Sequence, residues 1–193
     1  MYTLKHSQDE KVWFISDLHL SHNKDFVYKK RGFNSVGEMN ETLIKNLELC
    51  IAPEDTLYIL GDLVLCPIDE ARGLLARIPG KVIVIAGNHD TDARLALYEE
   101  LGFKVMFGAR LRYGKYHFFL SHYPTLSEND GEDYLTLAHI NIYGHTHQDW
   151  LWSSDRPFAL CVCPEACNCC PLEIKEIISH IKEMIALAKN KEI

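Results

Sequence analysis

The sequence contains no long hydrophobic run. No apolar stretch approaches the roughly 20 residues of a membrane-spanning helix, or the apolar core of a secretory signal. Residues 1–11 are mostly polar or charged. We therefore expect a protein that has no membrane partner and stays in the cytoplasm.

Positive charge is also in short supply. The 193 residues include 20 Lys and Arg against 27 Asp and Glu, a formal net charge of -7. Capture of long nucleic acid depends on a basic surface that displaces counterions from phosphates, so this balance argues against such a partner. A small phosphorylated substrate stays compatible with the sequence, because bound divalent cations reverse the field locally.

The cysteines lack the spacing of a zinc site. They number seven, which is odd, and without a secretory signal free thiols are favoured over a disulfide framework. Five of them are crowded together: Cys161, Cys163, Cys167, Cys169 and Cys170. The spacing has no paired C-x2-C knuckles, so small buried thiols are the favoured interpretation and a metal or redox role is the alternative.

What the sequence does contain is typical of one globular unit. Apolar residues make up 47% and charged residues 24% of the chain, which is enough to bury a core. No internal repeat, low-complexity tract or linker divides it. We expect a single domain over residues 1–193.

The order of hydrophobic patterns predicts the fold class. Short apolar runs indicate strands at residues 12–16, 56–60, 81–86, 103–107, 110–113, 116–121, 140–143 and 159–163. Helical spacing is found at residues 38–50, 69–77, 92–101 and 172–190, and a polar loop at 127–133 precedes a helical turn near Tyr134. Strands and helices alternate in the first half, whereas strands adjoin in the second. This order predicts an α/β (α+β) sandwich of two mixed sheets flanked by helices.

Several predicted strands end in residues that can bind a metal. These segments are Asp17-Leu18-His19, Gly61-Asp62, Gly87-Asn88-His89-Asp90, His122 and Gly144-His145-Thr146-His147. Because the carboxyl ends of such strands open onto one rim, we expect these side chains to meet there. Oxygen and imidazole ligands without thiolates suit Mn, Fe or Zn, and two such ions can promote in-line displacement at phosphorus.

The same segments carry a resemblance to a known family. In order they match the pattern D-x-H, G-D, G-N-H-[DE], H and G-H-x-H of the calcineurin-like metallophosphoesterase superfamily, which the sequence resembles. The resemblance implies one metal ion held by Asp17, His19, Asp62 and His147. It implies a second held by Asp62, Asn88, His122 and His145, with Asp62 bridging the two ions.

The resemblance also implies roles in catalysis. A metal-bridging hydroxide would attack phosphorus, and His89, which is left off the metals, would be the general acid. Asp90 has two open interpretations: it orients His89, or it caps the helix that begins at Thr91 or Asp92.

Three further residues are candidates for substrate binding. His22 and Asn23 follow the first segment in a run similar to small bacterial members of the superfamily, and Arg31 ends a nearby basic run. The alternatives are a polar loop for His22 and Asn23 and a solvated basic face for Arg31.

Together these features predict a dinuclear-metal phosphoesterase that hydrolyses a small phosphate ester, with a phosphodiester favoured. Two alternatives stay open: a phosphomonoesterase on the same site, and a non-catalytic metal-binding scaffold on the same fold. A scaffold would be expected to have lost ligands or the off-metal imidazole, and the sequence retains all of them. The sequence does not indicate an oligomeric state.

Overall fold

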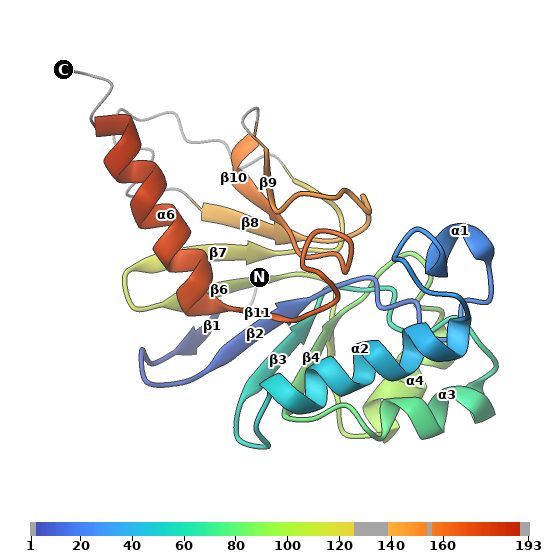
Figure 1. Ribbon diagram of the computed structural model, residues 1–193. Coiled ribbons are helices and arrows are strands. Elements are labelled where there is room, and N and C mark those ends of the chain that lie inside the picture. The colour runs from blue at the N-terminus through green and yellow to red at the C-terminus, as the bar shows by residue number, and fades with distance from the viewer. Residues whose placement is uncertain (1–2, 126–138, 154–155, 190–193) are drawn as a thin grey trace.

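The computed structural model describes residues 3–125, 139–153 and 156–189. In this part of the chain, strands form two mixed sheets with helices around them (Figure 1). The predicted loop at residues 127–133 and the turn near Tyr134 lie outside the described residues. None of the described helices is both long and apolar enough to cross a membrane.

The five-stranded sheet has the order β11-β2-β3-β4-β5. Its four parallel strands are β2 (Val12–Ile15), β3 (Thr56–Ile59), β4 (Lys81–Ile85) and β5 (Lys104–Met106). At one edge β11 (Leu172–Glu173) pairs antiparallel with β2. Strands β2 and β3 are buried along their whole length, as expected for parallel strands covered on both faces.

The six-stranded sheet has the order β1-β6-β7-β8-β10-β9. Its strands are β1 (Thr3–His6), β6 (Ala109–Tyr113), β7 (Tyr116–Leu120), β8 (His139–Tyr143), β9 (Trp152–Ser153) and β10 (Arg156–Cys161). The predicted hairpin across Gly114 and Lys115 is confirmed, because β6 and β7 pair antiparallel on either side of it. Gly114 adopts φ 59°, a left-handed backbone that glycine accepts without strain.

Three helices cover the outer face of the five-stranded sheet (Figure 1). They are α2 (Val36–Cys50), α3 (Ile68–Leu75) and α4 (Asp92–Glu100), and the short helix α1 (Asp25–Tyr28) precedes them. The apolar stripe of α2, which includes Leu43 and Leu47, packs in one core with Leu57 and Ile59 of β3. Helix α2 begins at an N-cap, Ser35, whose side chain accepts a hydrogen bond from the Glu38 amide.

A second core fills the space between the two sheets. Phe14 and Tyr58 of the five-stranded sheet pack there with Phe118 and Ile142 of the other sheet, and helix α6 (Ile174–Lys189) adds Ile177. The predicted sandwich of two mixed sheets flanked by helices is thereby confirmed.

The predicted start of the C-terminal helix is wrong. The helix expected over residues 172–190 begins only at Ile174. Leu172 and Glu173 instead pair with Phe14 and Trp13 at the free edge of the sheet. The helical period alone could not reveal this pairing, because the partner strand, β2, lies about 160 residues earlier in the chain.

Candidate active site

The carboxyl ends of strands from both sheets meet at one place. Past the end of β2, the amide of Asp17 donates to the carbonyl of Gly61, and the amide of Ser16 donates to the carbonyl of Val162. The amide of Gly144 donates to the carbonyl of His122. Together with the bond from the Val162 amide to the carbonyl of Tyr143, they join the loops that follow β2, β3, β7, β8 and β10, which carry four of the five predicted ligand segments.

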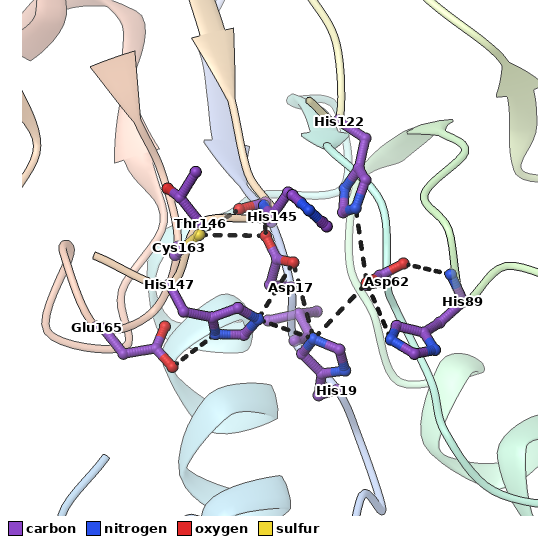
Figure 2. A network of polar contacts seen from close by, with 12 residues as sticks. Asp17, His19, Asp62, His89, His122, His145, Thr146, His147, Cys163 and Glu165 are labelled. Carbon is purple, nitrogen blue, oxygen red and sulfur yellow. Dashed lines mark hydrogen bonds and ion pairs between the residues drawn. The ribbon is translucent and has the colours of Figure 1, made fainter. Parts of the chain in front are cut away.

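The first group of ligand atoms consists of Asp17, His19 and His147 (Figure 2). Asp17 Oδ1 lies 3.7 Å from His19 Nε2 and 3.5 Å from His147 Nε2, and the two Nε2 atoms are 3.1 Å apart. Asp17 Oδ1 is buried and accepts no hydrogen bond within the described part of the chain. A buried carboxylate oxygen without a donor, facing two imidazole nitrogens, fits a divalent cation.

Asp62 lies at the centre of the cluster. Its Oδ2 atom is 3.8 Å from His19 Nε2, 3.6 Å from His122 Nε2 and 4.0 Å from His89 Nε2. One carboxylate oxygen therefore faces both the first group and the imidazole predicted for the second metal. This is the position that a bridging ligand needs.

The second group gathers around His122. Its Nδ1 contacts the carbonyl of Leu60 at 2.8 Å, and its Nε2 lies 2.9 Å from Asn88 Oδ1. A proton on Nδ1 held by that carbonyl leaves the Nε2 lone pair free for a metal. The ring centroids of His145 and His122 are 5.0 Å apart, and the two rings lie on the same side of the cluster (Figure 2).

The electrostatics of the cluster also suit cations. Burial raises the pKa of Asp17, but the imidazoles of His19, His147 and His122 outweigh it and hold that pKa well below its usual range. Burial, followed by the nearby His122, lowers the pKa of His145. Both shifts favour the forms that bind metals, an ionised carboxylate and a neutral imidazole.

Five of the seven predicted ligands have a left-handed backbone, which side-chain-bearing residues rarely adopt. They are Asp17 (φ 49°), His19 (φ 48°), Asp62 (φ 55°), His145 (φ 66°) and His147 (φ 46°). Such conformations cost about 1 kcal/mol or more each and persist only where the surrounding structure enforces them. Their concentration in one cluster makes it the candidate functional centre of the molecule.

Comparison with known protein families agrees with this geometry. A family model described as calcineurin-like phosphoesterase matches residues 10–161. The chain belongs to this family. It is a metal-dependent phosphoesterase, a class that acts on small phosphate esters, and the predicted family is confirmed.

Relatives of the phosphoesterase are found in an archaeon and in phages. Protein MJ1445 of Methanocaldococcus jannaschii is 32% identical over 184 residues, which cover 90% of this chain and 92% of the relative. The gene 66 protein of Mycobacterium phage L5 is 30% identical over 166 residues, with 74% and 80% covered. Among solved structures, protein AQ665 of Aquifex aeolicus has a TM-score of 0.67 at 24% identity and covers 89% of this chain and 99% of its own. That last similarity supports the fold alone.

His89 and Asp90 of the phosphoesterase have different surroundings. The His89 imidazole is 47% exposed and faces the cluster, while its backbone amide donates to Asp62 Oδ1. Asp90 matches neither predicted role. Its carboxylate accepts hydrogen bonds from the amides of Asp62 and Gly87 and from the hydroxyl of Tyr98, so it joins the two ligand loops. The helix cap after it is Thr91.

A cavity of about 590 Å³ opens beside the cluster. Besides ligand residues, its wall contains His22, Phe26, Val27 and Lys30. Burial, together with the charges of His19 and His89, lowers the pKa of His22 to about 4. Phe26 is 71% exposed, and its ring meets the ring of His22 edge-on. The wall therefore offers an apolar surface next to the predicted metal ligands.

The other two predicted substrate contacts are placed differently. Asn23 is exposed and does not line this cavity. The Arg31 side chain is fully buried, and its donors face the carbonyls of Leu18 and Asp17 and the carboxylate of Glu165. A phosphate clamp by Arg31 is not supported, because no part of its guanidinium reaches the cavity.

Two further residues at the site had no role assigned from the sequence, although Lys30 belongs to the basic run that ends at Arg31. Glu165 lines the cavity and contacts His147 Nδ1 at 2.9 Å. Burial raises the pKa of Glu165, but the hydrogen bond with His147 and the charge of Arg31 lower it to about 2. Lys30 donates to the carbonyl of His147. Neither residue belongs to a recognisable motif, and only their places in the fold reveal them.

The crowded cysteines are free thiols. Cys161, Cys163 and Cys169 are buried, whereas Cys167 and Cys170 are partly exposed. No cysteine joins a potential metal-ligand group within the described residues. The thiol of Cys163 donates to Asp17 Oδ2 at 3.2 Å, so this cysteine supports the ligand loop from behind.

Proposed function

We propose that the protein is a dinuclear phosphodiesterase that acts on small diesters, organised as a single domain over residues 1–193. The observation that carries the proposal is the position of Asp62, whose Oδ2 faces imidazoles from three separate loops at 3.6 to 4.0 Å. We assign the two ions to the ligand sets that the family resemblance implies. The oxygen and imidazole donors suit Mn, Fe or Zn.

The ions, when bound, would acidify a water molecule and offset the negative charge of the phosphoryl oxygens. The remaining chemistry belongs to the protein. We assign the general acid to His89, which would pass the proton on Nε2 to the leaving ester oxygen. Its half-exposed ring can then regain a proton from solvent, and the hydrogen bond from its amide to Asp62 Oδ1 keeps it beside the cluster.

The lining of the cavity supports a diester. A phosphodiester carries two organic groups, of which one leaves and the other stays on phosphorus. Phe26 and Val27 provide an apolar surface beside the ligand cluster, where the group that stays can bind. A cytoplasmic location and the absence of long nucleic acid as a partner remain predictions from the sequence.

The test is hydrolysis by protein that has been stripped of metal and reloaded with Mn²⁺, Zn²⁺ or Fe²⁺. We expect metal-dependent turnover of bis-(p-nitrophenyl) phosphate that exceeds turnover of p-nitrophenyl phosphate. Equal or faster monoester hydrolysis would replace the proposal with a phosphomonoesterase. Tight metal binding without hydrolysis of any ester would support the scaffold.

A leaving-group series tests the role of His89. With His89→Gln, we expect kcat to fall about 10²- to 10⁴-fold for a phenyl diester, whose leaving oxygen needs a proton. The loss for a p-nitrophenyl diester should be much smaller, because that leaving group departs as an anion. His117→Gln, on β7 outside the cavity lining, is the matched control. Equal losses across the series would refute general acid catalysis by His89.

A further inference from the structure

Behind the first ligand group lies a buried carboxylate that touches no predicted metal position. Glu165 follows β10, and its side chain is only 3% exposed. Its Oε1 lies 2.9 Å from His147 Nδ1 and 3.0 Å from Arg31 Nε. Figure 2 shows Glu165 beyond His147, on the side of that ring away from Asp62. One oxygen thus joins an imidazole ligand to a guanidinium.

The guanidinium continues the connection to the first ligand loop. Arg31 Nη2 donates to the carbonyl of Asp17 at 2.7 Å, and Nη1 donates to the carbonyl of Leu18 at 2.9 Å. The Arg31 side chain is 0% exposed. Arg31 therefore fixes the backbone between Asp17 and His19, the two ligands that share a metal group with His147.

We propose that Glu165 and Arg31 form a brace that positions His147 against the Asp17–His19 loop and thereby sets the affinity of the first metal position. Glu165 is a positioning residue in this proposal, since it acts through His147. The inference rests on the proposed dinuclear site but adds residues that lie outside the family pattern.

The physical reason is the orientation of the His147 ring. An acceptor at Nδ1 keeps the proton on that nitrogen and leaves the Nε2 lone pair directed at the cluster, 3.5 Å from Asp17 Oδ1. An anionic acceptor also makes the imidazole a stronger ligand. Loss of such an outer partner typically weakens metal binding about 10- to 100-fold.

The brace should act on one metal position and not on the other. His122, which belongs to the second group, is held through Nδ1 by the carbonyl of Leu60 and has no contact with Glu165 or Arg31 among the described residues. Asp62 is held by the amide of His89 and by Asp90. A residue that merely supported the fold would weaken both positions together.

The experiment is a Mn²⁺ titration of the metal-free protein by calorimetry and electron paramagnetic resonance, which yields two dissociation constants. We expect Glu165→Gln to weaken one ion about 10- to 100-fold and to leave the other within about twofold of wild type. Glutamine keeps the size of the side chain but removes its charge. The exposed Glu176→Gln on α6 is the matched control and should change neither constant.

A second variant keeps the test decisive if Glu165→Gln does not fold. Arg31→Lys retains the charge but replaces three separate donor nitrogens with a single one, which does not match the fork geometry that reaches both carbonyls and Glu165, so the same single ion should be weakened. Unchanged affinities, or equal weakening of both ions, would overturn the brace. If wild-type protein itself fails to bind two ions, the dinuclear proposal fails instead, so the two failures are distinguishable.

Discussion

Gly144→Ala is expected to damage the metal centre through a single added methyl group. Gly144 precedes His145 in the loop after β8 and packs directly on the end of β2. Its φ is not in the left-handed region, so alanine would not strain the backbone itself. The added Cβ would, however, lie 2.6 Å from Ser16 Cβ and would overlap Asp17 Oδ2.

The size of the effect follows from ordinary contact distances. Carbon atoms in contact are about 3.5 to 4.0 Å apart, so the two loops must separate by about 1 Å. That shift would break the 2.8 Å hydrogen bond from the His145 amide to Asp17 Oδ2. Metal ligation tolerates only about 0.2 Å, and an error of about 1 Å at a reacting centre can cost 10²-fold in rate.

We therefore expect Gly144→Ala to lower kcat/KM for an aryl phosphodiester about 100-fold and to weaken Mn²⁺ binding. The assay is steady-state hydrolysis together with a metal titration, with circular dichroism to confirm the fold. Gly73→Ala is the matched control, because Gly73 lies exposed on α3 with nothing within 4 Å of an added Cβ. That control should keep full activity and gain about 0.5 to 1 kcal/mol in free energy of unfolding. Activity of Gly144→Ala within twofold of wild type would refute the close approach of these loops as a requirement of the site.

Three further outcomes are expected. Asp90→Ala should lower the free energy of unfolding of the metal-free protein, measured in urea, by about 3 kcal/mol, because the buried amide of Asp62 and the partly buried amide of Gly87 lose their acceptor. Tyr98→Phe removes only the hydroxyl's hydrogen bond to Asp90 and should cost about 1 kcal/mol. Equal losses in the two variants would contradict this account. Phe26→Ala should raise KM for a bis-aryl diester about tenfold through lost apolar contact, with kcat little changed. An unchanged KM would show that the apolar surface at Phe26 does not take part in substrate binding. The Glu10 pKa is lowered to about 2, chiefly by the hydrogen bond from the Ser7 amide and then by His6. A lowered carboxyl pKa stabilises the fold above the unfolded value of 4.5, and this contribution disappears as pH falls through 2. Glu10→Gln should therefore flatten the pH dependence of the free energy of unfolding between these two values. An unchanged pH dependence in the variant would contradict the pKa shift.

The candidate ligands could be predicted from local sequence because each of them follows a strand with its own hydrophobic signal. Asp17, Asp62 and Asn88 come after β2, β3 and β4, and parallel neighbouring strands must end at one edge. The residue types and their order then restrict the chemistry to a few metals. The three helices that cover this sheet, α2, α3 and α4, were likewise predicted from their own hydrophobic period.

The supporting contacts had no such local signal. Arg31 and Glu165 are 134 positions apart and meet only after both sheets have assembled. Asp90 was assigned two local roles, yet besides the nearby Gly87 amide it accepts hydrogen bonds from the amide of Asp62, 28 positions away, and from the hydroxyl of Tyr98 on α4. The edge strand β11 was absorbed into a helix because its pairing with β2 spans most of the chain. Periodicity and motif spacing reflect the local structure that a residue forms with its neighbours in the chain. Long-range hydrogen bonds depend instead on how the elements pack, which cannot be read from a single sequence.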